Sequence, residues 1–299
     1  MRARRFLPTP LLAALLLALA PTGSGSATPT PDGAATTEET DPHNIEEPSW
    51  ADRFRWAGEE LHFTVEILGG EAARAALSIG PPIEHERWGR TVPIQGIAGS
   101  LGFFDRIYPM ENDGMTFLDP ETGLPFFAEK SIRERGNVRS YAVTYARHVF
   151  RADVRRVRDG RADSFRRFVP SDLHDGFSWI YDMRSRDLSV GHEFVYYIYD
   201  GWRLSRLTFR ILSHEWIDSP IGSRHAAYFQ VRRDVLDSSP LVPWAERTAV
   251  LPPVLHPTSS YVLGYGWLSL DEDRIPIGVQ LDSPLGPIRM MIRRHVPAR

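Results

Sequence analysis

Residues 60–79 read ELHFTVEILGGEAARAALSI, and this stretch decides the fold class. In its first half the apolar side chains recur at every second position, the period of a strand that buries one face: Leu61, Phe63, Val65 and Ile67. Gly69 and Gly70 then favour a turn, and residues 72–79 form a second apolar run. The stretch therefore predicts a β-hairpin.

The same signal recurs along the chain. Pairs of turn-forming residues separate further alternating runs, and each pair predicts another hairpin: Gly136-Asn137, Asp159-Gly160 and Asp200-Gly201. Hairpin-connected strands are antiparallel neighbours, because parallel pairs need long crossovers. We predict a mainly β fold, either an antiparallel barrel or a strongly curved sheet of roughly a dozen strands, since so many strands must curl to protect their edges.

Two smaller features complete this prediction. One short helix is expected over Asp172–Arg184, with Ser171 or Asp172 as N-cap, and it should cover an opening of the sheet. The segments 218–222 (DSPIG) and 282–286 (DSPLG) repeat one motif, in which Pro fixes a turn dihedral and Gly supplies positive φ. We interpret both as strand-connecting turns.

Composition excludes several classes of protein. The chain has 299 residues, 35 Lys and Arg against 38 Asp and Glu, and no cysteine. It therefore has no disulfide scaffold, thiolate metal site, Cys nucleophile or lipoprotein anchor. A net charge of -3 excludes the basic character of most nucleic-acid-binding proteins. Lys130 is the only lysine, and so the only candidate for lysine chemistry.

The N-terminus has the order of a secretory signal peptide. Three arginines precede the apolar run Leu11–Ala20, and small residues follow up to Ala27. Ten apolar residues are too few to span a bilayer, which needs about 20. We predict a signal peptide at 1–27 and a mature protein that is periplasmic or secreted from a Gram-negative bacterium and does not span the membrane. An uncleaved anchor is the alternative.

The remainder divides into a spacer and a domain. Residues 28–49 hold four prolines and six acidic residues with few apolar ones, a composition typical of disorder. Residues 50–299 should form one β-rich domain. Its segment 234–260 contains five prolines and is expected to be a long irregular excursion.

Catalytic and metal motifs are sparse. The ten histidines form no metal-ligand spacing, and no phosphate loop or nucleophile elbow occurs, so we expect no metal and no cofactor. The densest polar cluster is 171–184. Helical spacing places Asp175, Ser178 and Asp182 on one side and His174 off it. A capped helix with surface ion pairs accounts for this cluster, and a catalytic Ser–His–Asp assembly is the alternative.

Two other groups of residues are candidate binding elements. Segment 147–167 holds eight arginines, among which Arg151 and Arg155 can share one face of a strand and hold an anionic head group by forked hydrogen bonds. A solvated arginine face is the alternative. Aromatic residues in or beside the strands fill the core or line an apolar cavity: Trp179, Tyr196, Tyr197, Tyr199, Trp202, Trp216 and Trp267.

The order of several short motifs resembles the bacterial family called domain of unknown function 3108. These motifs are GEELHF at 58–63, DPETGLP at 119–125, SWIYDMR at 178–184 and WLSLDEDRIP at 267–276. The proline-rich segment 234–260 is longer than the family pattern. The resemblance implies an exported, envelope-associated β-rich domain without established chemistry. Tyr181, Arg184 and Asp273 match its motifs, so they join Arg151 and Arg155 as candidate site residues.

These observations favour a non-catalytic domain that binds an apolar or amphipathic envelope molecule, or an envelope protein. The alternatives are a lipid or glycan hydrolase that uses the 171–184 cluster and a purely structural envelope protein. The sequence does not indicate the oligomeric state.

Overall fold

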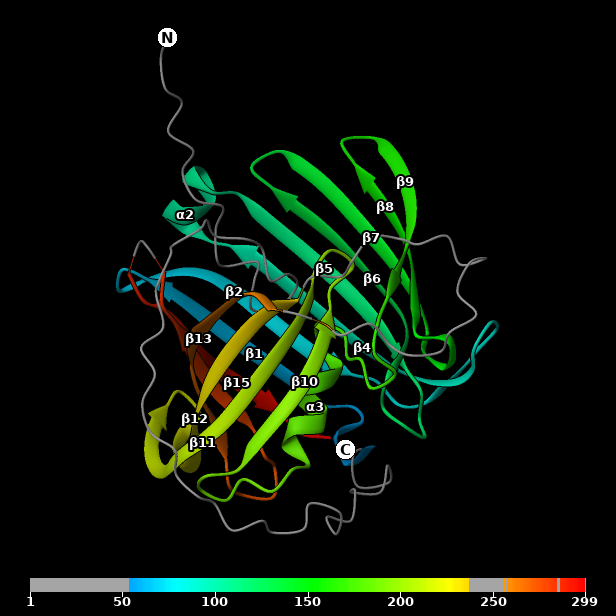
Figure 1. Ribbon diagram of the computed structural model, residues 1–299. Coiled ribbons are helices and arrows are strands. Elements are labelled where there is room, and N and C mark those ends of the chain that lie inside the picture. Colours follow the sequence, from blue (N-terminus) through cyan, green and yellow to red (C-terminus); the bar gives the residue numbers. More distant parts are fainter. Residues whose placement is uncertain (1–53, 237–254, 256, 284–285, 299) are drawn as a thin grey trace.

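Antiparallel strands make up most of the computed structural model, which describes residues 54–236, 255, 257–283 and 286–298 (Figure 1). The strands are β1 (Glu60–Ile67), β2 (Gly70–Ile79), β3 (Ile83–His85), β4 (Gly89–Ser100), β5 (Met110–Leu118), β6 (Pro125–Glu134), β7 (Asn137–Ala146), β8 (Arg151–Arg158), β9 (Arg161–Phe168), β10 (Glu193–Tyr199), β11 (Leu204–Ser219), β12 (Gly222–Leu236), β13 (Pro257–Ser269), β14 (Pro276–Leu281) and β15 (Ile288–Val296). The helices of the described part are α2 (Gly102–Ile107), α3 (Ser178–Arg184) and the 3-10 turns η2 (Phe54–Trp56) and η3 (Arg147–Val149). The predicted mainly β, antiparallel fold is confirmed, and α2 adds a helix to the one that was expected.

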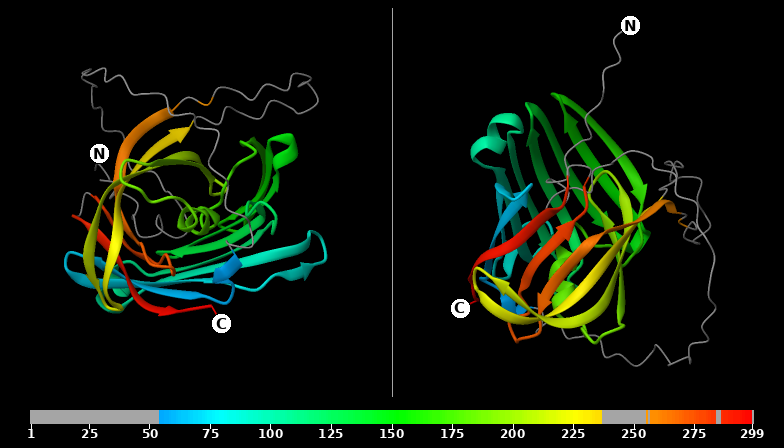
Figure 2. Two further views of the ribbon diagram at one scale, coloured as in Figure 1. Left: turned by 90° about the horizontal axis from the view of Figure 1, so that it is seen from below. Right: turned by 90° about the vertical axis from the view of Figure 1, so that its left-hand side faces the viewer.

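All these strands belong to a single 15-stranded sheet, whose order is β10-β11-β12-β13-β14-β15-β1-β2-β4-β5-β6-β7-β8-β9, with β3 paired to β4. The last strand, β15, pairs with the first, β1, so that Glu60 lies opposite Val296. The two edges are therefore β9 and β10, which follow each other in the chain. They do not pair, so of the two predicted forms the structure has the strongly curved sheet rather than the closed barrel (Figure 2).

The segment between these edges covers one of them. Beyond β9 the chain returns to form a parallel bridge between His174 and Ile198 of β10. The His174 amide donates to the Tyr197 carbonyl at 2.8 Å, and the Tyr199 amide donates to the His174 carbonyl at 3.0 Å. An exposed row of edge amides and carbonyls invites aggregation. The bridge satisfies part of that row.

The predicted hairpins are confirmed, with two of their turns displaced by one residue. Asp159 and Gly160 both have positive φ, as a tight two-residue hairpin turn requires. In the β1–β2 and β6–β7 hairpins, Leu68-Gly69 and Arg135-Gly136 have this geometry instead of the expected pairs. In each of these two turns glycine takes the second central position, so the turn lies one residue earlier than predicted. The repeated DSPIG motif connects β11 to β12, as expected.

Helix α3 begins later than the sequence pattern indicates. The prediction was Asp172–Arg184, whereas α3 spans Ser178–Arg184. His174 is held in the bridge to β10, so its backbone cannot be helical as well. The shorter helix lies inside the curve of the sheet, where the view from below shows it end-on (Figure 2).

The short segment 173–183 reaches all three hydrophobic clusters of the described core. Phe177 and Tyr181 belong to the cluster around β1 and β2, Met183 to that around β11 and β12, and Leu173 to that around β7 and β8. One covering segment therefore packs against most of the concave face. Burial of these side chains contributes about 1.5–3 kcal/mol each, an upper range that excludes the entropy cost.

Three predictions concern segments that lie wholly or partly outside the described residues. The signal peptide 1–27 and the spacer 28–49 lie outside the described residues. The segment 234–260 was expected to be irregular throughout, but its two ends are paired strand residues. Residues 234–236 belong to β12 and residues 257–260 belong to β13. Most of the rest of this segment is also outside the described part. Within that part, no helix has the length and apolar character needed to cross a membrane.

Candidate functional site

A capping box fixes the N-terminal end of α3. The Ser178 amide donates to the Asp175 carboxylate at 2.8 Å, and the Asp175 amide donates to Ser178 Oγ at 3.1 Å. This reciprocal pair is the arrangement that satisfies two helix-terminal amides at once. Thr116 of β5 also donates its hydroxyl to the Asp175 carboxylate, which ties the cap to the sheet. The N-cap position is Phe177, which makes no side-chain cap hydrogen bond, so it is neither Ser171 nor Asp172, and Asp175 holds the first helical amide from two residues before the N-cap.

Glycine makes room for the residue just before the helix. Phe177 is 3% exposed, and its ring lies where a side chain of Gly96 on β4 would be. A Cβ at position 96 would be 2.5 Å from the ring, closer than carbon atoms approach. The backbone of β4 thus forms the seat for Phe177.

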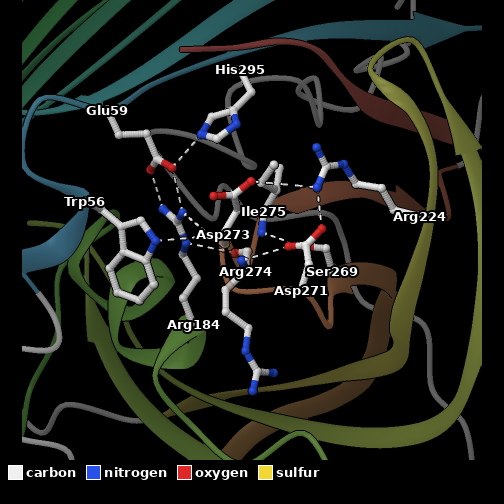
Figure 3. A network of polar contacts seen from close by, with 10 residues as sticks. All are labelled: Trp56, Glu59, Arg184, Arg224, Ser269, Asp271, Asp273, Arg274, Ile275 and His295. Carbon is white, nitrogen blue, oxygen red and sulfur yellow. Dashed lines mark hydrogen bonds and ion pairs between the residues drawn. The ribbon is translucent and has the colours of Figure 1, made fainter. Parts of the chain in front are cut away.

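A buried arginine fixes the other end of α3. Arg184 is fully buried and forms a two-pronged ion pair with Glu59, with one of its contacts at 2.7 Å (Figure 3). Its Nε donates to the Arg274 carbonyl at 2.8 Å, and its second terminal nitrogen donates to the Asp273 carbonyl at 2.9 Å. The guanidinium also lies 4.2 Å above the Trp56 ring. Neutralisation and these several acceptors are what a buried guanidinium needs.

This group of contacts, here called the Arg184 clamp, joins distant parts of the chain. His295 Nε2 of β15 lies 2.9 Å from Glu59 Oε1, and Trp56 Nε1 donates to the Asp273 carbonyl at 3.1 Å. In Figure 3 the guanidinium lies between the indole and the carboxylate. The clamp connects α3 with the entry to β1, the turn between β13 and β14, and the end of β15.

The structure brings together the three candidate residues suggested by the family motifs, but their roles differ. Arg184 forms the clamp, while Asp273 takes part through its backbone carbonyl and has a half-exposed carboxylate 3.8 Å from Arg224. Tyr181 is 1% exposed, and its hydroxyl has no hydrogen-bond partner among the described residues. Burial raises the pKa of this phenol above its ordinary value. The arrangement around Arg184 holds structure together.

Arg151 and Arg155 lie elsewhere, on β8 next to the β9 edge. They share one face of the strand with Asp153, as expected from their spacing. Arg151 lies 3.0 Å from the Asp153 carboxylate, which also pairs with Arg166 at 3.2 Å. Arg155 is exposed. The face is therefore partly neutralised, and it is separate from the residues around α3.

The His174–Ser178 pair converges, contrary to the expectation from helical spacing. His174 Nδ1 lies 3.0 Å from Ser178 Oγ, because His174 precedes the helix instead of lying within it. The carboxylate of Asp175 is occupied by Thr116 and by the Ser178 amide. Ser178 is 1% exposed and forms part of the capping box. These contacts account for the cluster as the start of a helix.

Between α3 and the concave face lies an apolar hollow. Its cavity volume is about 110 Å³, and it opens to solvent on one side. Ile180 and Met183 of α3 line one side, and strand residues such as Phe63, Leu207 and Phe229 line the other. Among the described residues that line it, Asp200 alone carries charge. Sites for small molecules are concave and largely apolar, and they carry few polar groups.

Sequence reasoning anticipated such a cavity from the aromatic residues, yet named few of its lining residues. Trp179 and Trp267 line the hollow, whereas Tyr196 and Tyr199 are core residues and Trp216 is 73% exposed. The wall comes from eight strands and α3, so the only signal for it in the sequence was the alternation of apolar residues within each strand. Which alternating face meets α3 depends on the curvature of the sheet.

Comparison with known proteins places this fold in a family. A model of the family "Protein of unknown function (DUF3108)" matches residues 60–293, which run from β1 into β15. The chain belongs to the DUF3108 family. The resemblance found in the sequence motifs is thereby confirmed. No curated protein has significant sequence similarity to the chain.

Solved structures of similar shape are distant in sequence. A β-barrel-like protein of the DUF1849 domain from Brucella abortus is 7% identical with a TM-score of 0.48, covering 82% of this chain and 99% of that one. The hypothetical lipoprotein YmcC from Escherichia coli is 10% identical with a TM-score of 0.28, covering 85% and 92%. At such values neither structure transfers an activity to this family member.

Proposed function

We propose that this protein is an exported, non-catalytic binding protein that holds an apolar or amphipathic molecule of the cell envelope in the hollow beneath α3. The observation that carries this proposal is the hollow itself, an almost uncharged space held open between a helix and a sheet. A well-packed interior leaves few voids larger than a water molecule. An apolar space that opens to solvent suits a hydrocarbon guest.

The clamp and the seat of α3 support the same proposal. A helix held only by core packing could settle onto the sheet and close the space. Here Arg184 fixes one end by charged contacts, and the capping box with Phe177 fixes the other. These fixed points keep the helix at its distance from β11 and β12.

Export is the second part of the proposal. Its support is the order of arginines, apolar run and small residues at 1–27, followed by the acidic, proline-rich 28–49. A protein without cysteine also suits an oxidising compartment. The mature β-rich domain from residue 50 onward would then meet its ligand in the periplasm or outside the cell.

Binding can be tested with N-phenyl-1-naphthylamine, an uncharged apolar dye that becomes fluorescent in apolar sites. The wild-type protein should bind the dye. Ile180→Trp, which adds volume on the helix side of the hollow, should reduce its affinity at least tenfold. Val195→Trp is the matched control, because Val195 is 51% exposed on the β10 edge, and it should bind as the wild type does.

Native mass spectrometry of protein purified from its own envelope fraction completes the test. A co-purifying adduct of lipid size supports the proposal. An adduct-free mass, together with no binding of the dye, would overturn it in favour of a purely structural domain. Alkyl alcohols should bind roughly fourfold more tightly for each added methylene, because each buried CH₂ contributes about 0.8 kcal/mol.

A further inference from the structure

A separate cavity adjoins the Arg184 clamp. Its volume is about 400 Å³, and it opens to solvent. Its lining comes from η2, from the C-terminal end of α3 and from the turn between β13 and β14, and it shares no residue with the lining of the hollow. A single water molecule needs about 10–15 Å³ of such volume, so this cavity has room for a polyatomic ion.

Two arginines that line this cavity lack an anionic partner. The Arg55 guanidinium lies 4.5 Å from the centre of the Trp56 ring. Arg274 extends away from the clamp, and no dashed line in Figure 3 reaches its guanidinium. Within the part of the chain that the structure describes, neither side chain forms an ion pair or a hydrogen bond. Arg184, the third arginine of the lining, is neutralised by Glu59.

Arg274 is the less hydrated of the two unpaired cations. Its side chain is partly buried, and its Nη1 is hidden from solvent without a hydrogen-bond partner among the described residues. Burial lowers the pKa of Arg274, and the charge of Arg55 lowers this pKa further, while Asp187 and Asp271 act in the opposite direction. A partly desolvated charge is costly unless an opposite charge compensates it. The pair of guanidiniums therefore favours an anion in this cavity.

The acidic residues of the lining do not supply that anion. The Asp271 carboxylate already accepts from Arg224, from Ser269 Oγ at 2.7 Å and from the Arg274 amide at 3.2 Å. Glu272 is exposed, so its carboxylate stays hydrated. The charges of the lining that have no partner in the described part are thus two guanidiniums and one exposed carboxylate.

We propose that this cavity binds a phosphate group between the guanidiniums of Arg55 and Arg274. A guanidinium donates two parallel hydrogen bonds to a pair of oxygens. A tetrahedral phosphate has enough oxygens for two such pairs, whereas the two oxygens of a carboxylate are used up by one guanidinium. A phosphate dianion also matches the two unpaired positive charges. This site lies outside the hollow, so the inference goes beyond the binding function proposed above and does not depend on it.

Isothermal titration calorimetry with three soluble anions tests the site: inorganic phosphate, glycerol 1-phosphate and acetate. The titrations use pH 8, where phosphate is mainly a dianion, and low ionic strength, where charges are weakly screened. The wild type should bind inorganic phosphate about tenfold more tightly than acetate, or better. Absence of phosphate binding, or equal affinity for acetate, would overturn the proposal.

Glycerol 1-phosphate distinguishes two sources of the same group. An affinity equal to or above that for inorganic phosphate would support a phosphate monoester, such as the head of a lipid or a phosphorylated sugar. A clearly weaker affinity, with inorganic phosphate still bound, would support free phosphate as the ligand.

Variants of the two arginines locate the site. Arg55→Met and Arg274→Met should each weaken phosphate binding by about tenfold or more, the loss expected for one charge-assisted hydrogen bond. Arg106→Met is the matched control, because Arg106 is an exposed arginine of α2 that also has no ion pair among the described residues. It should bind phosphate as the wild type does. Unchanged phosphate affinity in both site variants would overturn the site.

A gain of affinity guards against variants that fold poorly. Glu272→Gln removes the unpaired negative charge of the lining and should tighten phosphate binding by about threefold. Glu121→Gln, which neutralises an exposed carboxylate of another turn, is its control and should have no effect. Weaker binding by Glu272→Gln would contradict an anion in this cavity.

Dye binding separates this inference from the proposed function. Because the two cavities share no lining residue, all these variants should bind N-phenyl-1-naphthylamine within about twofold of the wild type. Dye binding without phosphate binding would overturn the phosphate site alone. Phosphate binding without dye binding would overturn the hollow as a ligand site and support the phosphate site.

Discussion

At the residue scale, the Arg184 clamp gives a structural reason for a residue that matches a family motif. A buried guanidinium is costly unless it is paired and hydrogen-bonded, and Arg184 meets both needs with Glu59 and two backbone carbonyls. Asp273 supplies one of those carbonyls, so its side chain is not what the contact requires. Motif residues can therefore mark the chain connections that hold α3 in place.

The clamp gives the first prediction. Arg184→Met should lower the free energy of unfolding by about 3–5 kcal/mol, because it leaves Glu59 buried without its partner. Glu59→Gln/Arg184→Met should recover part of this loss, since no charge is then buried at that place. Urea denaturation of both single variants and the double variant measures the coupling. Additive losses in that cycle would contradict a direct ion pair.

Ser178 gives a second prediction at this scale. Ser178→Ala removes one half of the capping box and should cost about 1 kcal/mol of stability. It should leave dye binding unchanged, because the hydroxyl contacts His174 and a backbone amide and does not line the hollow. Ser164→Ala, at an exposed position on β9, is the control for stability. If Ser178→Ala instead abolished a hydrolytic activity of the wild type on envelope extracts, the hydrolase would replace the binding protein.

At the scale of elements, the position of α3 depends on a glycine of a neighbouring strand. Gly96→Ala should destabilise the protein and weaken dye binding, because the added Cβ would meet the Phe177 ring at 2.5 Å and displace the start of α3. Gly99→Ala on the same strand is the matched control, since its Cβ would have ordinary contacts, the nearest at 3.6 Å. Thermal unfolding and dye titration measure both effects. Equal losses in the two variants would show that strand backbone entropy, and not the seat of Phe177, is responsible.

Elements were predictable where local rules act alone. Alternation identified the strands, and turn residues located the hairpins to within one residue. The start of α3 was missed because His174 pairs with β10, a contact between segments that no local pattern records. The Asp175–Ser178 pair before the helix has a local signature, Asp followed three residues later by Ser, but the competing acceptors Ser171 and Asp172 obscured it.

At the scale of the whole molecule, the sequence was compatible with a closed barrel and with a curved open sheet, and the structure has the open sheet. The pairing of β15 with β1 places the edges at β9 and β10, which the chain then separates with α3. The candidate site follows from this arrangement, since the hollow is lined by residues of β1, β2 and β10 to β15 together with α3. No single stretch carries that information.

Because the hollow exists only when all these elements are assembled, ligand binding should stabilise the whole molecule. A ligand that binds only the folded state at a hundred times its dissociation constant adds about 2.7 kcal/mol. An alkyl alcohol at that concentration should therefore raise the urea midpoint of the wild type and of Val195→Trp by equal amounts. Ile180→Trp, in which the added indole occupies the hollow, should show no rise. If the alcohol displaces the dye while the urea midpoint of the wild type stays constant, the dye site forms without the fold. That result would contradict a hollow built by α3 and the sheet.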